Sequence, residues 1–265
     1  MIYFCKRMSF YSIAFISLFV FIAGFVDSIA GGGGLISLPA YLFMGLPADN
    51  AIVCNKFGAG CGTTFSALNF FKSGVVRPKI VLISIPFAFT FAQLGMRLAL
   101  SLEPIILKTI LFFALPIVGV IILCKKDLGG KDEEAKLSKK KKVIFAILIG
   151  AIIGFYDGIF GPGTGTFAII AYTTFMKQEL RIAVGNSKLL NLSSNYSSLI
   201  VGIFSGKIIY SIAIPAAIAG IIGNYIGSSL AIKNGKKIIK PMMIIVVALL
   251  FLNLLYSLVS TMYFK

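Results

Sequence analysis

The sequence has 265 residues, of which 58% are hydrophobic and only 13% are charged, and its mean hydropathy is +0.97. Soluble domains average about 45–50% apolar and about 25% charged residues, so this composition excludes an ordinary soluble protein and indicates an integral membrane protein. The formal charge of +16 does not indicate nucleic-acid binding, because most basic residues flank apolar segments or lie in the polar stretch 125–142, where they set membrane orientation.

The sequence contains no histidine, which removes the commonest metal ligand and the usual general base. The cysteines Cys5, Cys54, Cys61 and Cys124 lie in or beside apolar segments, without the spacing of a disulfide framework or a metal site. We therefore expect no metal, no cofactor and no catalytic residue.

Eight segments are long and apolar enough to cross a bilayer, which takes roughly 20 residues. In chain order they are 9–27, 51–71, 79–101, 104–124, 143–159, 186–205, 208–231 and 240–262. Two shorter apolar pieces, Leu35–Met44 and Thr166–Phe175, each follow a glycine-rich break. They predict re-entrant or broken helices, which a membrane tolerates only where the backbone is buried in protein or lines a cavity.

The chain contains an internal duplication. Residues 24–33, Gly-Phe-Val-Asp-Ser-Ile-Ala-Gly-Gly-Gly, match residues 154–163, Gly-Phe-Tyr-Asp-Gly-Ile-Phe-Gly-Pro-Gly, without a gap. The match predicts an all-α integral membrane protein with two homologous repeats of about four transmembrane helices, each with a short Gly-rich re-entrant or broken helix. The repeats are 1–124 and 143–265, and a charged linker, 125–142, joins them. Such repeats are typical of secondary transporters, whose sites lie at the repeat interface.

The basic residues predict the orientation. If each half crosses four times, Lys6-Arg7, the basic residues at 72–79 and the linker fall on one side, so both termini and the linker are expected in the cytoplasm. The cluster at 233–240 then falls outside, against the rule. If the short pieces cross fully, each half has five spans and the repeats are inverted, and both arrangements stay open.

The glycine runs are the first candidate site, because each lies between a long span and a short helix. Free N–H groups at the start of a helix carry partial positive charge and bind anions, while close helix packing through small residues is the alternative. A nucleotide-binding loop is excluded, since no Lys-Ser/Thr follows and no strand precedes. The residues predicted to bind substrate are Gly31, Gly32, Gly33, Gly34, Gly161, Gly163, Thr164 and Gly165.

Asp27 and Asp157 occupy the same place in the two repeats. A carboxylate in an apolar span is costly and is usually functional or paired, so both are candidates for ion coupling, for pairing with a lysine or for capping the following glycine loop. Arg97 stands alone in its span and is a candidate for an anion contact or for a pair with an acid.

Asn55-Lys56 recurs in the second half around Asn186 and Lys188. A buried ammonium needs a counter-charge, so these four residues are also predicted to bind an anionic substrate, with snorkelling of the lysines to the membrane interface as the alternative. One helical face carries polar residues in the second half and small or polar residues at the matching positions of the first half, and this face indicates either a substrate path or contacts between helices. The residues are Ser187, Asn191, Ser194 and Ser198 in the second half, and Asn55, Ala59, Gly62 and Ser66 at the matching positions in the first.

These motifs resemble those of a known family. The first-half string Gly-Phe-Val-Asp-Ser-Ile-Ala-Gly-Gly-Gly-Gly-Leu-Ile-Ser-Leu-Pro, together with Asn55-Lys56, and the second-half string around Gly161-Pro162-Gly163 are similar to the signatures of the TauE/SafE sulfite exporter family. The resemblance covers essentially the whole chain. It implies a secondary transporter of the bacterial inner membrane that exports small sulfur-containing anions, although many members have no established substrate.

The sequence thus predicts a multi-pass protein of the cytoplasmic membrane that carries a small anionic solute, such as sulfite or an organosulfonate. A passive anion channel and, more remotely, a membrane enzyme that uses the two aspartates as a dyad are the alternatives. The partners expected are the solute, the lipid bilayer and a second copy in a homodimer. Substrate identity, transport direction and coupling ion stay open.

Overall fold

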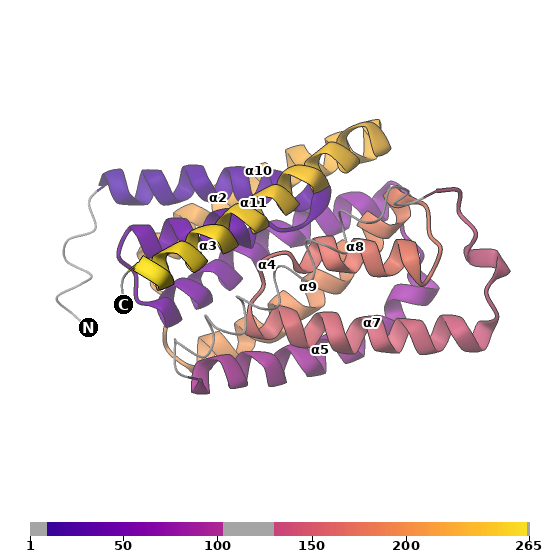
Figure 1. Cartoon of the computed structure of the whole chain (residues 1–265), viewed down its shortest axis with the longest axis horizontal. Coiled ribbons are helices and arrows are strands. Elements are labelled where there is room, and N and C mark those ends of the chain that lie inside the picture. The colour runs from indigo at the N-terminus through magenta and orange to yellow at the C-terminus, as the bar shows by residue number, and fades with distance from the viewer. Residues whose placement is uncertain (1–9, 103–129, 264–265) are drawn as a thin grey trace.

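The computed structural model describes residues 10–102 and 130–263, which form helices and no strand (Figure 1). The predicted span 104–124, the cysteines Cys5 and Cys124 and the basic pair Lys6-Arg7 lie outside the described residues. The two described cysteines, Cys54 and Cys61, are free thiols.

The helices follow the order of the predicted segments. The first half contains α2 (Phe10–Ala30), α3 (Gly34–Phe43), α4 (Ala48–Lys72) and α5 (Pro78–Ser101). The linker contains a short 3-10 helix, η1 (Glu134–Lys136), and is followed by α7 (Lys139–Ile159), α8 (Thr164–Thr174), α9 (Leu180–Phe204), α10 (Tyr210–Asn234) and α11 (Lys236–Tyr263). Within the described residues α2, α5, α7 and α10 are long and apolar enough to cross a membrane, which confirms a helical membrane protein.

The outer faces of these helices are apolar. Large exposed side chains recur every third or fourth residue, as at Ile144, Leu148 and Ile152 of α7 and at Ile214 and Ile218 of α10. This spacing places them along one stripe of a helix. Soluble proteins rarely expose continuous apolar surface of this kind, so these stripes are the surfaces that face lipid.

The inner faces carry small residues. Gly150, Gly154 and Gly158 of α7 face Ser84, Ala88 and Ala92 of α5, and a Cβ added at Gly154 would lie 2.6 Å from the Cα of Ala88. Contacts this close bring helix backbones together, which is how helices associate within a membrane. Close packing is thus the role of the glycines inside α7.

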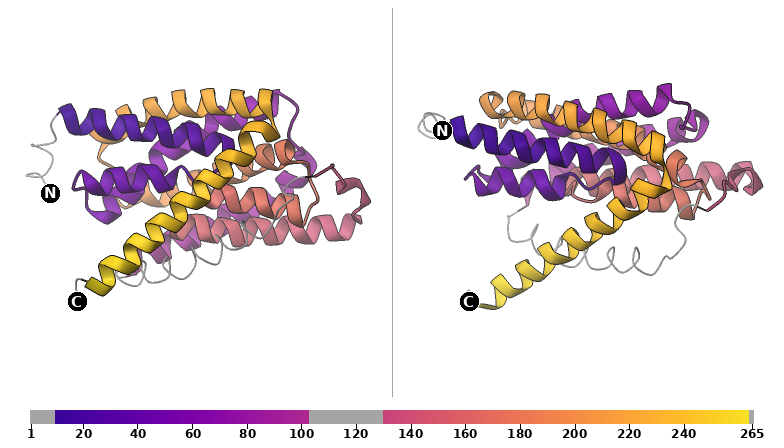
Figure 2. Two further views of the ribbon diagram at one scale, coloured as in Figure 1. Left: turned by 45° about the horizontal axis from the view of Figure 1, so that its top comes forward. Right: turned by 90° about the horizontal axis from the view of Figure 1, so that it is seen from above.

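Each short helix folds back along the long helix before it. The rings of Phe15 in α2 and Phe43 at the end of α3 are 5.9 Å apart, and those of Phe145 in α7 and Phe175, just after α8, are 5.7 Å apart. The chain reverses in two glycine turns, residues 31–33 and 160–163. The helices α4, α5, α9 and α10 pack around the two hairpins, whereas α11 runs obliquely away from the bundle toward its C-terminal end (Figure 2).

The helices α4 and α9 run in opposite directions at the centre of the bundle. Near the start of α4, the Asn50 side chain donates a hydrogen bond to the Lys207 main chain after α9, at 2.8 Å. At the other end, the Arg77 main-chain N–H after α4 donates to Asn186 near the start of α9, also at 2.8 Å. The two halves therefore lie head to tail along the bundle axis.

The start of α2 and the end of α11 lie at one end of the bundle and the described part of the linker at the other (Figure 1). Because α4 and α9 have 25 residues each, about 37 Å at 1.5 Å per residue, a whole membrane thickness separates these ends. The prediction that the termini and the linker share one side does not fit this arrangement.

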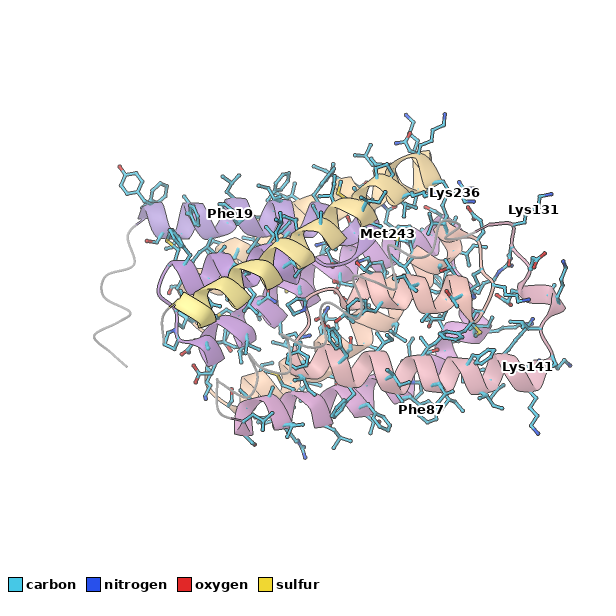
Figure 3. All side chains as sticks on the ribbon, in the orientation of Figure 1. Phe19, Phe87, Lys131, Lys141, Lys236 and Met243 are labelled. Atoms are coloured by element: carbon cyan, nitrogen blue, oxygen red, sulfur yellow. The ribbon has the colours of Figure 1, made fainter. Side chains whose placement is uncertain are left out.

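Basic residues gather at the linker end, where Figure 3 shows Lys131, Lys141 and Lys236. Contacts tie the segments of this end together: Arg77 pairs with Asp132 of the linker, and Arg181 donates to the Ile232 main chain at the end of α10. The cluster at 233–240, which the sequence alone put on the side opposite the linker, thus lies on the same side as the linker.

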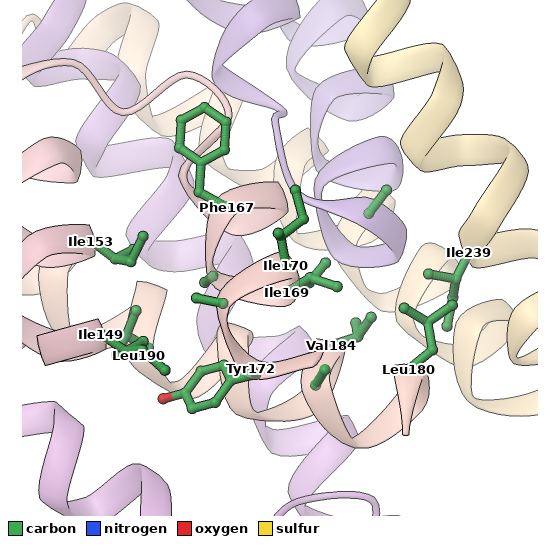
Figure 4. Close-up of a cluster of buried hydrophobic side chains, with 14 of the residues drawn as sticks. Ile149, Ile153, Phe167, Ile169, Ile170, Tyr172, Leu180, Val184, Leu190 and Ile239 are labelled. Atoms are coloured by element: carbon green, nitrogen blue, oxygen red, sulfur yellow. The ribbon is translucent and has the colours of Figure 1, made fainter. Parts of the chain in front are cut away.

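The largest cluster of buried hydrophobic side chains includes many residues of α7, α8 and α9 (Figure 4). Ile149, Ile153, Phe167, Tyr172 and Leu190 are all buried there. This packing fixes α8 against α9 and so holds the second glycine turn in the middle of the molecule.

The two glycine turns touch each other. Gly31, with a φ of +77°, lies against Gly165 and Thr166, and a Cβ added at Gly165 would be 2.6 Å from the Cα of Gly31. The Thr166 hydroxyl donates to the Ala30 carbonyl at 2.9 Å. Backbone meets backbone at this point, so neither turn has room for a side chain.

Gly31→Ala is expected to destabilise the protein by about 1–3 kcal/mol, the usual cost of overpacking, in addition to the strain of alanine at positive φ. Gly45→Ala is the matched control, because Gly45 has a φ of +84° and no atom lies within 4 Å of its added Cβ. Thermal unfolding in detergent should show a clearly larger loss for Gly31→Ala. Equal losses would mean that conformation alone requires the glycine.

Candidate functional site

Asp27 of α2 binds two groups at the inner end of its helix. Its Oδ1 accepts the Gly33 main-chain N–H at 3.1 Å, and its Oδ2 lies 2.7 Å from the Lys188 Nζ of α9. The Lys188 side chain is 0% exposed and that of Asp27 is 17% exposed. Asp27 therefore both caps the glycine turn and neutralises a fully buried ammonium from the other half of the chain.

Lys56 of α4 pairs with Asp157 of α7 in the corresponding way. Its Nζ lies 2.9 Å from Asp157 Oδ2, and the two side chains are 3% and 2% exposed. The ammonium also donates to the Asp157 main-chain oxygen at 2.7 Å and to Asn195 Oδ1 at 3.3 Å. Oδ2 itself accepts no hydrogen bond within the described residues, so charge rather than an aligned hydrogen bond holds this contact.

The two ion pairs cross between the halves of the chain. Within the described residues, each aspartate lies in the first helix of one half, α2 or α7, and each lysine in the third helix of the other half, α9 or α4. An unpaired charge at such depth would cost several kcal/mol. The pairs therefore lock the two halves together, and each aspartate supplies the counter-charge that the sequence assigned to a substrate.

A cavity of about 40 Å³ lies beside the Lys56–Asp157 pair. That is room for about three water molecules, at 10–15 Å³ each. Its walls come from α2, α3, α4, α7, α9, α10 and both glycine turns. The polar side chains in the walls are Asp27, Ser37, Asn55, Lys56, Thr63, Asp157, Asn191, Asn195 and Asn224.

Several of these polar groups have hydrogen-bonding capacity to spare. The Thr63 hydroxyl and the Asn224 Oδ1 are buried and find no partner within the described residues. The Asn195 amide donates to Asn191 Oδ1 at 2.7 Å. This bond uses the side-chain oxygen of Asn191, and the Asn191 amide N–H groups stay available as donors. Buried polar groups are normally satisfied, so unpaired ones around a cavity indicate a place for a polar ligand.

The predicted residues of the two glycine turns differ in where they lie. Gly33, Gly34 and Gly161 line the cavity, and an added Cβ at Gly161 would lie 3.3 Å from the Lys56 Nζ. The others lie away from it: Gly31 and Gly165 form the contact between the turns, and an added Cβ at Gly32 would meet Val246. The remaining two are Gly163, in a left-handed conformation just before α8, and Thr164, whose hydroxyl donates to the Gly161 carbonyl.

The other predicted residues also differ in whether they line the cavity. Asn55 and Lys56 line the cavity, whereas Lys188 does not. Asn186 lies at the linker end, where it accepts from the Arg77 main chain and donates to Gln178 at 2.8 Å. Arg97 is exposed on α5 and is not among the residues that line the cavity.

Asn195, Thr63 and Asn224 are cavity residues that were not predicted as a site from the sequence. Asn191 appeared there only as one member of a polar helical face. A signal for Asn195 was present, because it follows Asn191 by four residues and so lies one turn further on the same face. Nothing in the sequence singled out Thr63 within its helix.

Comparisons with known proteins agree with this architecture. The family model described as "Sulfite exporter TauE/SafE" matches residues 16–254. The probable membrane transporter protein YfcA of Escherichia coli K12 is 35% identical over 241 residues, 89% of this chain and 87% of that protein. The probable membrane transporter protein ORF9 of Sinorhizobium is 34% identical and covers 94% of this chain and 95% of that protein.

A probable membrane transporter protein of Haemophilus influenzae is 32% identical, over 89% of this chain and 92% of its own length. No solved structure matches the chain. The names of these relatives describe transporters and not enzymes, in agreement with the prediction. With a match that spans nearly the whole sequence, the chain belongs to the TauE/SafE family.

Proposed function

We propose that this protein is a secondary transporter that carries a small anion across the cytoplasmic membrane through the cavity beside Lys56. The observation that carries the proposal is a buried ammonium at the wall of a polar cavity, next to hydroxyl and amide groups with unused hydrogen-bonding capacity. The description of the family as sulfite exporters makes sulfite and small organosulfonates the first anions to test, and export the first direction.

We also propose that the two halves are inverted repeats. The crossed ion pairs support this, and so do two matched hydrogen bonds: the Arg77 N–H donates to Asn186, and the Ile209 N–H donates to the Cys54 thiol. Ile209 lies 132 residues after Arg77, and Asn186 lies 132 residues after Cys54, so the two contacts join equivalent positions of the two halves. The opposite directions of α4 and α9 then give an axis parallel to the membrane, as in many secondary transporters.

In this arrangement α2 with α3, and α7 with α8, are re-entrant hairpins that enter from opposite sides and meet at their glycine turns. Three full crossings per half complete the fold: α4, α5 and the predicted span 104–124 in the first half, and α9, α10 and α11 in the second. Tilting one hairpin and its neighbours against the other half would open the cavity alternately to the two sides.

The linker end faces the cytoplasm in this proposal. Lysines and arginines on short loops are retained on that side, and this end holds Arg77, Arg181 and the lysines of the linker and of 233–240. At the other end, Lys207 pairs with Asp49 at 2.6 Å. The start of α2 and the end of α11 then lie on the outer side.

Cysteine labelling in intact cells tests this orientation. In a background without native cysteines, Ser138→Cys should react with a membrane-impermeant maleimide only after permeabilisation, because Ser138 lies in the linker. Ala48→Cys, at the opposite end, should react in intact cells. Both residues are exposed, so accessibility rather than burial decides the result, and the reverse pattern would invert the proposed topology.

Flux into proteoliposomes tests the function itself. We expect saturable uptake of at least one of sulfite, sulfate, methanesulfonate and sulfoacetate, whereas a channel would show no saturation. Asn191→Leu should lower the flux roughly tenfold, because it removes an amide worth about 0.5–1.5 kcal/mol and fills the cavity. Asn69→Leu is the control, since Asn69 of α4 lies outside the cavity and donates to Ser228 and Ser229. The absence of flux for every anion would contradict the proposal.

A further inference from the structure

Lys56 has two hydrogen bonds and one ion-pair contact in this structure. Its ammonium has three donors, and three oxygens surround it: the Asp157 Oδ2 at 2.9 Å, the Asp157 main-chain oxygen at 2.7 Å and Asn195 Oδ1 at 3.3 Å. If the cavity binds an anion, as the proposed function requires, that anion competes with these oxygens for the ammonium. The carboxylate Oδ2 is the competitor that carries charge.

Displacement alone would leave an unbalanced charge. Before binding, the ammonium and the carboxylate sum to zero in a site where both side chains are nearly unexposed. An added monoanion would give the site a net charge of −1, and a buried uncompensated charge is strongly disfavoured. One proton on the displaced carboxylate restores neutrality: the ammonium then pairs with the anion, and Asp157 becomes a neutral carboxylic acid.

We propose that Asp157 is the proton-coupling residue of this protein, and that Lys56 exchanges the Asp157 carboxylate for a small monoanion together with one proton. The Asp157 Oδ2, which accepts no hydrogen bond within the described residues, is the atom that takes the proton, and that proton enters from the bulk solution together with the anion. Release of the anion reverses the exchange: the proton leaves Oδ2 and the carboxylate returns to Lys56.

The surroundings of Asp157 leave Lys56 as its only cationic contact among the described side chains. On its own helix, the neighbouring Tyr156 donates its hydroxyl to the Pro162 carbonyl at 2.8 Å. From α8, Tyr172 donates to Ser84, and Arg97 of the adjacent α5 is exposed. From α9, Lys188 is held by Asp27.

The charge balance of the site also determines which class of substrate it binds. A monoanion needs one proton, whereas a dianion would need a second, and the remaining carboxylate at the cavity, Asp27, is held by both Lys188 and the Gly33 N–H. The site is therefore matched to a single negative charge, with the amides of Asn191 and Asn195 placed to orient oxygen atoms around it.

Uptake of labelled methanesulfonate into proteoliposomes tests this inference. Methanesulfonate is the anion of a strong acid, so its own protonation cannot imitate coupling. With the interior one pH unit more alkaline, the protein should accumulate the anion up to about tenfold, since one proton moves with each monoanion. An imposed membrane potential should not change the accumulation, because the exchange moves no net charge.

Asp157→Asn should abolish accumulation under the pH gradient, while Glu133→Gln, at an exposed linker carboxylate, should keep it. If Asp157→Asn folds poorly, proton uptake by the purified unmodified protein gives the same information: a pH indicator should report one proton bound per methanesulfonate. Four results would each overturn the inference and leave the proposed function standing. The first two are a flux that does not depend on pH and a flux that depends on the membrane potential. The other two are transport of sulfite but not of methanesulfonate, and tenfold accumulation by Asp157→Asn. If no anion moves at all, both fail together.

Discussion

Replacing Lys188 by methionine is expected to lower the stability of the protein by about 3–5 kcal/mol, the usual cost of removing one partner of a buried ion pair. The Lys188 side chain is fully buried and its Nζ lies 2.7 Å from Asp27 Oδ2. Methionine fills a similar volume, so the loss comes from the carboxylate that is left without its counter-charge. The measurements are the yield of monodisperse protein in detergent and the midpoint of thermal unfolding.

A second substitution should restore most of this loss. Asp27→Asn, added to Lys188→Met, removes the stranded charge and keeps an oxygen that can accept the Gly33 N–H. Replacing a buried pair by neutral groups is often close to neutral in stability. Lys140→Met is the control, because Lys140 is exposed in the linker region. If Lys188→Met alone were as stable as the unmodified protein, the crossed pair would not hold the two halves together.

Much of the helical architecture could be predicted because it depends on local pattern. The apolar segments located the long helices, and the glycine breaks located α3 and α8 to within about two residues at each end. The duplicated aspartates and lysines pointed to the residues that form the central ion pairs. These features follow from residue type and spacing, which a single sequence displays.

The partners within the pairs could not be predicted in the same way. Asp27 is closer in sequence to Lys56 than to Lys188, yet it pairs with Lys188, because the head-to-tail arrangement of the halves brings α2 next to the inner part of α9. That arrangement depends on tertiary packing. The basic cluster at 233–240 was the one sequence signal for it, since it violated the charge rule for four crossings per half.

The length of α2 gave no indication of the re-entrant hairpin that we propose. With 21 mostly apolar residues it satisfies the length rule for a full crossing, and the contact with α3, which folds back along it, is what supports the re-entrant hairpin proposed above. The same holds for α7. Length alone cannot distinguish a spanning helix from a long helix that begins outside the bilayer and ends within it.

Neutralising the two ion pairs one at a time should separate their roles. The double variant Lys56→Met, Asp157→Asn removes the cation at the cavity, and Lys188→Met, Asp27→Asn removes the other pair. Both variants are expected to fold, because no charge is left unpaired in either. The first should lose anion transport roughly ten- to a hundredfold, since a charged hydrogen bond contributes about 1.5–3 kcal/mol. The second should lose much less, because Lys188 does not line the cavity and Asp27→Asn keeps a polar side chain in its wall.

The physical reason for this difference lies in how the two halves fill the space around their lysines. Beside Lys56 stand Asn191 and Asn195, which line the cavity, whereas the core around α8 and α9 is filled by Phe167 and Leu190. Initial rates of methanesulfonate and sulfite uptake, normalised to folded protein in the membrane, give the comparison. Equal losses in the two double variants would contradict a single asymmetric site and would mean that Lys56 and Lys188 take turns at the anion as the two repeats exchange conformations.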